Sequence, residues 1–247
     1  MNILGIIPSR YASTRLPGKP LIDLAGKSMI QRVYEQCEKA QSLAEVVVAT
    51  DDQRILDHVE SFGGKAVMTS QLHETGTERS AEVMRNIGSN YDYAINIQGD
   101  EPFIHPSQID TLANLLDGKN QLATLARVCD SEFHLFSNNS AKVTFNDSNE
   151  ALYFSREPIP HLRNLDPKIW HEQGQHYIHI GIYGYEAEVL QELVKLPASQ
   201  LEKSESLEQL RWLSNGYKIK VGFTDHPSYG IDSPEDVEPL LKMFNKA

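Results

Sequence analysis

The chain has 247 residues, with 23 lysines and arginines against 34 aspartates and glutamates, so its formal net charge at pH 7 is -11. This acidic balance argues against nonspecific binding to nucleic acid or to an anionic membrane. The two cysteines, Cys37 and Cys129, give no disulfide framework, and no apolar run approaches the ~20 residues of a membrane span. Because the N-terminus also lacks a signal peptide, we expect a cytoplasmic protein with one domain over residues 1–247.

Short apolar runs alternate with amphipathic segments along the first hundred residues. Residues 3–7, 44–50, 65–68 and 93–97 are short and rich in branched side chains, which favours buried strands. Between them, helical spacing of apolar residues follows the capping residues Ser28 and Asp51-Asp52. This alternation predicts right-handed βαβ units, and therefore an α/β fold whose mixed, mainly parallel sheet is flanked by helices.

A basic loop, residues 8–20, follows the first predicted strand. It carries Arg10, Arg15 and Lys19, and three prolines stiffen it. Most loop cations are solvated surface charges, and that interpretation stays open here. Ligands bind at the carboxyl ends of strands in open α/β sheets, however, so we interpret the loop as a site for a polyphosphate.

A second polar loop, residues 73–79, leads into a predicted helix. Thr75 and Glu78 have the spacing of a capping box, which explains the sequence without a ligand. A helix N-terminus also offers free backbone N–H groups and the positive end of a dipole. The loop is therefore also a candidate contact for a nucleotide base or phosphate.

An acidic turn follows the strand at residues 93–97. Asp100 is a suitable oxygen ligand for Mg²⁺, which uses one or two carboxylates and completes its shell with water and phosphates. A lone Asp-Glu pair in a turn is often structural, so the metal hypothesis needs a second carboxylate. Asp232 is our candidate, because a helix starting at Ser233 and Pro234 explains the acids after it but leaves Asp232 without a role.

The middle of the chain departs from simple alternation. Residues 142–145 and 151–154 read as a hairpin, and residues 176–185 as a long strand. Arg156 and His179 have structural interpretations, as an ion-pair partner and as a satisfied histidine. Both also suit an acid that carries several hydroxyls, since arginine binds carboxylates with two hydrogen bonds. Further on, a core-facing helical stripe is predicted over residues 201–213, and residues 164–175 are predicted to be a polar surface excursion.

Seven motifs, taken in order, resemble the 3-deoxy-manno-octulosonate cytidylyltransferase (CMP-Kdo synthetase) family. They extend over nearly the whole chain and lie at residues 8–21, 76–79, 98–102, 153–156, 179–185, 207–211 and 230–236. The first motif is shared with related sugar nucleotidyltransferases. Arg156, His179 and the pair Glu208-Gln209 are the features that point to this acid sugar.

The resemblance implies a glycosyltransferase-A-like, Rossmann-related fold with a small β excursion, a homodimer, and conversion of CTP and Kdo to CMP-Kdo and pyrophosphate for lipopolysaccharide biosynthesis. Residues 142–185 would contribute to the sugar site and to dimer contacts. The implied residues fall into four groups: catalytic, Arg10, Arg15, Lys19 and Asp100; nucleotide-binding, Pro8, Ser9, Arg10, Lys19, Gly76, Thr77 and Arg79; Kdo-binding, Gln98, Arg156, His179, Tyr185, Glu208 and Gln209; and Mg²⁺-binding, Asp100 and Asp232.

Two alternatives stay open. One is a related enzyme for another acid sugar, such as sialic acid or the 8-amino analogue of Kdo. The other is a nucleotide-binding module without catalysis; the loop after the first strand has no GxGxxG, which argues against a dinucleotide site.

Overall fold

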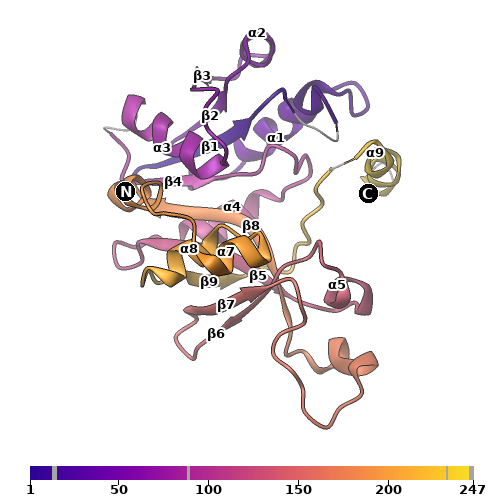
Figure 1. Ribbon diagram of the computed structural model, residues 1–247. Coiled ribbons are helices and arrows are strands. Elements are labelled where there is room, and N and C mark those ends of the chain that lie inside the picture. The colour runs from indigo at the N-terminus through magenta and orange to yellow at the C-terminus, as the bar shows by residue number, and fades with distance from the viewer. Residues whose placement is uncertain (13–15, 88–89, 232, 245–247) are drawn as a thin grey trace. The chain divides into compact units, whose positions relative to one another are not determined.

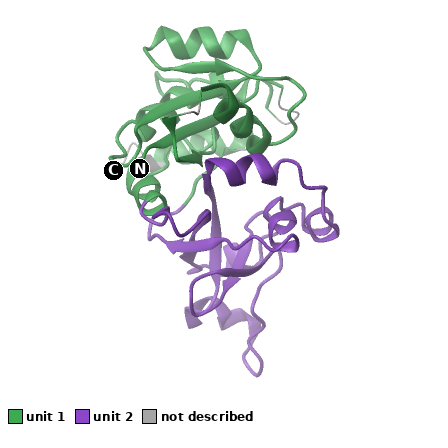
Figure 2. Cartoon of the chain, turned by 90° about the vertical axis from the view of Figure 1, so that its left-hand side faces the viewer, with its two compact units in different colours: residues 1–113, 228–247 green, residues 114–227 purple. Residues whose placement is uncertain are grey.

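The computed structural model describes residues 1–12, 16–87, 90–231 and 233–244. The chain divides into two compact units, which Figure 2 colours separately: unit 1 comprises residues 1–113 and 228–247, and unit 2 comprises residues 114–227. The single nucleotidyltransferase domain expected over residues 1–247 stays a prediction. Residues 142–185 belong entirely to unit 2.

Unit 1 is built on a parallel sheet. Its strands are β1 (Ile3–Ser9), β2 (Glu45–Thr50), β3 (Ala66–Met68) and β4 (Tyr93–Asn96), in the order β3-β2-β1-β4 (Figure 1). The apolar side chains of β1 are fully buried, which is typical of a central parallel strand with both faces covered. The four predicted strands and their parallel pairing are confirmed.

Helices connect these strands and place their first turns beside the strand ends. They are α1 (Met29–Cys37), α2 (Gln53–Ser61), α3 (Gly76–Ile87) and α4 (Pro106–Ala113). The side chain of Ser28 accepts from the backbone N–H of Gln31 at 3.2 Å, and that of Asp52 from Arg54 at 3.0 Å, which confirms both predicted caps. The short helix η1 (Lys19–Leu21) lies in the loop after β1, and η4 (Pro234–Asp236) with α9 (Val237–Phe244) completes unit 1.

Unit 2 has a mixed sheet around β5 (Leu122–Val128). This strand pairs antiparallel with β8 (Tyr177–Glu186) and parallel with β9 (Lys220–Phe223). The predicted hairpin is present as β6 (Lys142–Phe145) and β7 (Ala151–Ser155), and β6 also pairs with β8. The expected β excursion in the middle of the chain is therefore confirmed.

The helices of unit 2 are α5 (Glu132–Phe136), η3 (Pro167–Gln173), α6 (Ala187–Leu193), α7 (Gln200–Glu205) and α8 (Gln209–Ser214). The helix predicted over residues 201–213 is split, because Ser206 takes a left-handed φ of 52° that ends α7. Leu207, Leu210 and Trp212 of its predicted stripe are nevertheless buried. The predicted surface excursion at residues 164–175 is confirmed, since most of its residues are exposed; Trp170 is the exception, because it is buried against His176.

Candidate active site

A pocket of about 280 Å³ lies at the carboxyl ends of β1 and β4 in unit 1. Three segments line it: the start of the basic loop with η1, the loop that opens α3, and the turn after β4. The lining residues are Pro8, Ser9, Arg10, Lys19, Pro20, His73, Glu74, Thr75, Gly76, Arg79, Gln98, Gly99 and Asp100. Sequence reasoning predicted all three segments as ligand contacts.

The basic loop is closed by hydrogen bonds between its two described ends. The backbone N–H of Gly18 donates to the carbonyl of Tyr11 at 3.0 Å, and Gly18 has a φ of 70°, a conformation that favours glycine. The guanidinium of Arg54 stacks on the Tyr11 ring, 3.4 Å from its centroid. These contacts hold Arg10 and Lys19 at the pocket; Arg15, the third predicted cation, lies outside the described residues.

The predicted metal ligand Asp100 faces one of the predicted phosphate-binding cations. Its Oδ2 lies 2.8 Å from Nζ of Lys19, whose side chain is only 12% exposed. The backbone N–H of Ile231 donates to the carbonyl of Asp100 at 3.0 Å, so the segment leading to residue 232 runs beside Asp100. Asp232 itself lies outside the described residues.

Gly99 brings the turn after β4 against the end of β1. A Cβ atom at this position would lie 2.7 Å from the carbonyl oxygen of Pro8, too close for any side chain. The backbone of this turn therefore approaches β1 closely at Gly99. It fixes the neighbouring Gln98 and Asp100 at the pocket.

The opening turn of α3 is capped as predicted. Oγ1 of Thr75 accepts from the N–H of Glu78 at 3.1 Å, while the Glu78 carboxylate accepts from the N–H groups of Glu74 and Thr75. Gly76 lines the pocket, whereas Thr77 is buried on α3 and does not line it. The backbone of this turn thus remains available to a ligand.

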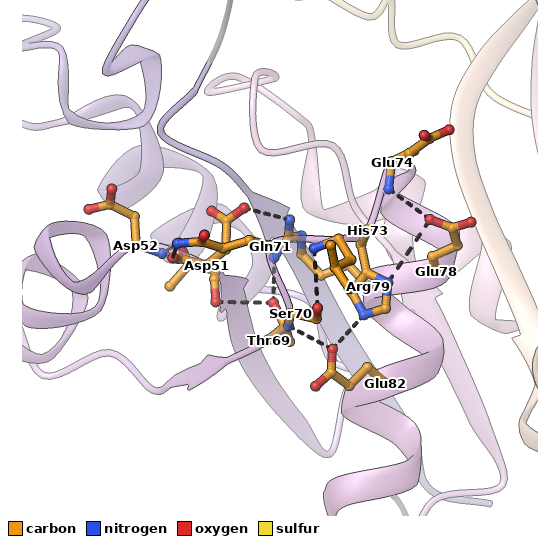
Figure 3. Close-up of polar contacts among 12 residues, drawn as sticks. Asp51, Asp52, Thr69, Ser70, Gln71, His73, Glu74, Glu78, Arg79 and Glu82 are labelled. Atoms are coloured by element: carbon orange, nitrogen blue, oxygen red, sulfur yellow. Dashed lines mark hydrogen bonds and ion pairs between the residues drawn. The ribbon is translucent and has the colours of Figure 1, made fainter.

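Arg79 is buried in an ion pair, so its side chain is not free to contact a nucleotide base. It is 3% exposed, and its guanidinium donates to Oγ1 of Thr69 and to Oδ2 of Asp51, the latter at 3.0 Å (Figure 3). Thr69 in turn donates to the carbonyl of Thr50 at 3.0 Å. Arg79 therefore joins α3 to the ends of β2 and β3. Because Arg79 also lines the pocket, a nucleotide would contact it while its guanidinium remains paired with Asp51.

His73 also lines the pocket; it begins the loop predicted as a contact at residues 73–79 but was not singled out as a site residue. Its Nε2 hydrogen-bonds the Glu82 carboxylate, and its Nδ1 lies 4.0 Å from that of Glu78 (Figure 3). The Glu82 carboxylate also accepts from the N–H of Ser70 at 2.8 Å. Burial acts to raise the pKa of this carboxyl, but the hydrogen bonds from Ser70 and His73 outweigh it, so that the pKa is lowered. The position of His73, two residues before the capping residue Thr75, was the available signal in the sequence.

In unit 2, Arg156 is held by backbone groups rather than by an ion pair. Its Nε donates to the carbonyl of Glu205 and its Nη1 to that of Asn138, both at 2.6 Å, and Nη2 donates to Ser206 at 3.2 Å. The Glu205 carboxylate accepts from the N–H of Arg156 at 2.9 Å and from the hydroxyl of Ser155 at 2.7 Å. Three of the five N–H donors of the guanidinium are used, so donors remain for a ligand carboxylate.

The long strand β8 carries His179, Tyr183 and Tyr185. Burial lowers the pKa of His179 to about 3, and its Nε2 lies 2.9 Å from Oγ1 of Thr124. Tyr185 is fully buried and packs against Trp212. The hydroxyl of Tyr183 is buried and makes no hydrogen bond within the described part of the chain, and burial raises its pKa well above the usual value, with smaller contributions from Tyr185 and Glu208. Tyr183 is a candidate ligand contact that the motif showed but that we did not single out.

Glu208 and Gln209 begin α8. Glu208 occupies the N-cap position and Gln209 is 4% exposed. Arg156, His179 and Glu208 all belong to unit 2, whereas Gln98 lines the pocket of unit 1. The roles assigned to these residues stay predictions.

Glu101, next to Asp100, is buried. Burial raises the pKa of its carboxyl to about 7, although a hydrogen bond with Ser228 acts in the opposite direction. Among the described residues, no three His, Cys, Asp or Glu side chains gather as a metal-binding cluster. No helix in the described ranges has the length and apolar character needed to cross a membrane.

Comparisons with known proteins point to one activity. A family model described as cytidylyltransferase matches residues 4–219. A 3-deoxy-manno-octulosonate cytidylyltransferase of Parabacteroides distasonis is 54% identical over 99% of this chain and 98% of its own length. The corresponding protein of Bacteroides thetaiotaomicron is 53% identical over 96% of each.

Solved structures agree in fold. A CMP:2-keto-3-deoxy-manno-octonic acid synthetase complexed with CTP superposes with a TM-score of 0.92 at 41% identity, covering 100% of this chain and 99% of that one. A cytidylyltransferase of Leptospira borgpetersenii has a TM-score of 0.65 at 17% identity, with coverage of 100% and 88%, and shows the shared fold alone. The expected nucleotidyltransferase fold is confirmed.

Proposed function

We propose a function from one premise: the chain belongs to the 3-deoxy-manno-octulosonate cytidylyltransferase family. It is a nucleotidyltransferase that converts CTP and Kdo to CMP-Kdo and pyrophosphate, and so activates Kdo for lipopolysaccharide biosynthesis. One structural observation carries this function. Arg10, Lys19 and Asp100 meet at the opening turn of α3 in a single pocket, the combination that a metal-bound nucleoside triphosphate requires.

The reaction is an in-line displacement at phosphorus. A bond forms between the anomeric oxygen of Kdo and the α-phosphorus of CTP, and the bond from that phosphorus to the pyrophosphate oxygen breaks. The anomeric hydroxyl loses its proton as pyrophosphate leaves. Because the protein has little covalent work to do, positioning and charge neutralisation dominate, and Arg10 and Lys19 supply the positive charge.

We propose Mg²⁺ as the cofactor, with Asp100 and Asp232 as its protein ligands. The residues present fit a magnesium ion, since one or two carboxylates suffice when phosphates supply other ligands. The Asp100 side chain is 37% exposed, so its carboxylate could be reached by an ion and would then give up its contact with Lys19. A bound Mg²⁺ would neutralise phosphate charge and lower the pKa of the attacking hydroxyl.

The acid sugar is assigned to a second set of residues. Arg156 offers its remaining donors to the sugar carboxylate, and Gln98, His179, Tyr185, Glu208 and Gln209 bind its hydroxyls, with Tyr183 added from the structure. A guanidinium already oriented by three carbonyls loses little side-chain entropy when it binds a carboxylate. Kdo is therefore preferred over a neutral sugar.

We propose that the protein is a homodimer in the cytoplasm. Large apolar side chains are exposed on and beside α5 and η3, which contact each other in unit 2. Phe133 on α5 is 76% exposed, and Phe136 on α5, Ile169 on η3 and Leu165 just before η3 are more than one third exposed. Exposed apolar clusters of this kind are typical of interfaces. This face would provide the dimer contacts predicted for residues 142–185, extended by α5, which precedes that range.

The test is pyrophosphate release by the full chain with CTP, Mg²⁺ and Kdo, repeated with UTP and ATP. We expect rapid release only with CTP and Kdo together. Competition with sialic acid and with the 8-amino analogue of Kdo then ranks the acid sugars. Turnover with sialic acid in preference to Kdo would reassign the substrate, and CTP binding without any release would favour a nucleotide-binding module.

A further inference from the structure

His179 is fixed from behind by a threonine on the neighbouring strand. Thr124 is completely buried in β5, and its Oγ1 lies 2.9 Å from Nε2 of His179. The same oxygen lies 2.7 Å from the carbonyl of Ile182 and 3.2 Å from that of Ile180. One hydroxyl thus contacts two carbonyl acceptors and one ring nitrogen.

An irregularity in the sheet creates this arrangement. Thr124 pairs with Tyr183 and Leu125 with Ile180, so Gly181 and Ile182 of β8 are accommodated between the two pairs. A bulge redirects side chains and carbonyls that a regular ladder would keep apart. Here it points two carbonyls of β8 at the Thr124 hydroxyl on the side where His179 meets it.

Counting protons assigns the direction of each hydrogen bond. A hydroxyl has one proton, and two oxygens 2.7 Å apart require a proton between them, so Thr124 donates to Ile182. Its oxygen can then only accept from His179, which must carry its proton on Nε2. Nδ1 is left as the unprotonated acceptor.

The other ring nitrogen is accessible to a ligand. Within the described ranges, Nδ1 of His179 makes no hydrogen bond. The His179 side chain is partly exposed, and this nitrogen is not fully buried. Phe154 and Tyr183 pack against the ring at centroid distances of 5.0 and 5.3 Å and restrict its rotation. Burial keeps the imidazole neutral at neutral pH, since its pKa is lowered to about 3.

We propose that Thr124 is a positioning residue that holds His179 in the Nε2–H tautomer, so that Nδ1 accepts a hydrogen bond from a hydroxyl of the acid sugar. This inference rests on the proposed function, in which His179 contacts the sugar. It specifies what that contact recognises: a hydroxyl as hydrogen-bond donor. A sugar derivative with only an acceptor at that position, such as a methyl ether, would meet a lone pair and bind poorly.

The direct test is ¹⁵N NMR of the histidine-labelled full chain without substrate, with His179 assigned by its loss in H179Q. We expect a protonated Nε2 and an unprotonated Nδ1 for His179. His176 is an internal reference, because its Nε2 lies 2.9 Å from the carbonyl of Pro160 and must also carry the proton. Protonation of His179 on Nδ1 would overturn the proposal without bearing on whether the enzyme turns over Kdo.

A kinetic test uses T124V, which removes the hydroxyl at nearly constant volume, and T124S, which retains it. We expect T124V to raise KM for Kdo by about 3- to 10-fold, the loss expected for one hydrogen bond, with a much smaller change in KM for CTP. T124S should recover the wild-type KM. Equal rises in both KM values, or T124S as impaired as T124V, would show a merely structural role.

The two levels of the proposal fail differently. If the wild-type enzyme releases no pyrophosphate with Kdo, the proposed function fails. The tautomer of His179 is measured without substrate, so that result is independent of the activity. If T124V does not fold, the NMR assignment on wild type and the kinetics of T124S retain the test. Turnover of Kdo with an unchanged KM in H179Q would remove the sugar contact and with it the inference.

Discussion

At the scale of single residues, the site depends on charges that are paired before any substrate arrives. Lys19 and Asp100 hold each other at 2.8 Å, and the Arg156 side chain is held by three carbonyls. Each group is thereby oriented for a partner of opposite charge. Because these side chains are already held in place, less side-chain entropy is lost when a substrate binds.

Replacement of the Asp100 carboxylate tests its role as a metal ligand. We expect D100N to lower kcat by at least ~100-fold, because the amide oxygen is neutral and binds Mg²⁺ weakly. The measurement is Mg²⁺-dependent pyrophosphate release. D147N, at an exposed position in the turn between β6 and β7, is the matched control and should behave as wild type; near-normal turnover of D100N would remove Asp100 from the metal site.

The neutral state of His179 predicts a pH effect on stability. Between about pH 6.5 and about pH 3, the unfolded chain binds a proton at this histidine that the native protein does not, since burial lowers the native pKa to about 3. The free energy of unfolding should therefore fall with decreasing pH by up to about 1.4 kcal/mol per pH unit from this residue.

Urea unfolding of wild type and H179Q at pH 7, 6 and 5 measures this contribution. We expect a shallower decline with acid for H179Q. H105Q, which replaces an exposed histidine, is the matched control and should keep the wild-type slope. Equal slopes for wild type and H179Q would mean that His179 is protonated in the native state.

At the scale of elements, backbone approaches and bonds between distant segments place the side chains. The turn after β4 packs on the end of β1 through Gly99, and the end of α7 holds the end of β7 through Glu205. Each contact joins elements that are far apart in the sequence.

Gly99 is the first element-scale test. In G99A the new Cβ would lie 2.7 Å from the carbonyl of Pro8, so we expect the turn to shift, with a loss of about 1–3 kcal/mol in the free energy of unfolding and a lower kcat. Thermal unfolding and pyrophosphate release measure the two effects. G230A, where a Cβ meets none of the described residues within 4 Å, should leave stability within about 0.5 kcal/mol of wild type.

Glu205 provides the second test at the scale of elements. We expect E205Q to raise KM for Kdo about 10-fold, because the neutral amide weakens the charge-assisted bonds from Ser155 and the Arg156 backbone that place the guanidinium. Steady-state kinetics with Kdo varied at saturating CTP measure it. E188Q, exposed in the first turn of α6, is the matched control; an unchanged KM for Kdo in E205Q would show that Arg156 needs no such support.

Local sequence predicted what local physics determines. The caps at Ser28, Asp52 and Thr75 and the unit 1 strands have short-range signals and were predicted correctly. The strand β5 was not predicted, because Leu122–Val128 contains two alanines and, near its end, Arg127, a composition that is not typical of a buried strand. The break at Ser206 was missed because the apolar spacing continues across it.

The site shows the same division. The pocket of unit 1 could be predicted from loops at strand ends, since parallel strands bring those loops together. The roles of Arg156 and His179 came from family resemblance, and their supports escaped both routes: Glu205 is 49 residues from Arg156, and Thr124 is 55 residues from His179. No periodicity or short motif marks a partner at such separation.

At the scale of the whole molecule, two features bear on function. The net charge of -11 opposes the anionic substrates, so Arg10 and Lys19 must capture CTP locally rather than through a general attractive field. The exposed apolar side chains of α5 and η3 are the second feature, because the proposed association of two copies rests on them.

Association can be tested with one substitution on that face. We expect wild type to be a dimer by light scattering and F133D to be monomeric at micromolar concentration, since a buried unpaired carboxylate is costly in an apolar interface. L201D, at an exposed leucine on α7 outside residues 142–185, is the control and should stay dimeric. A monomeric wild-type protein would remove the dimer proposal.

The most direct test of the central claim is ³¹P NMR of the full chain with CTP, Mg²⁺ and Kdo. The account predicts that the triphosphate signals decline while a phosphodiester signal of CMP-Kdo and a pyrophosphate signal grow in equal amounts. Triphosphate signals that persist, or pyrophosphate that appears with free CMP and without a sugar phosphodiester, would contradict it.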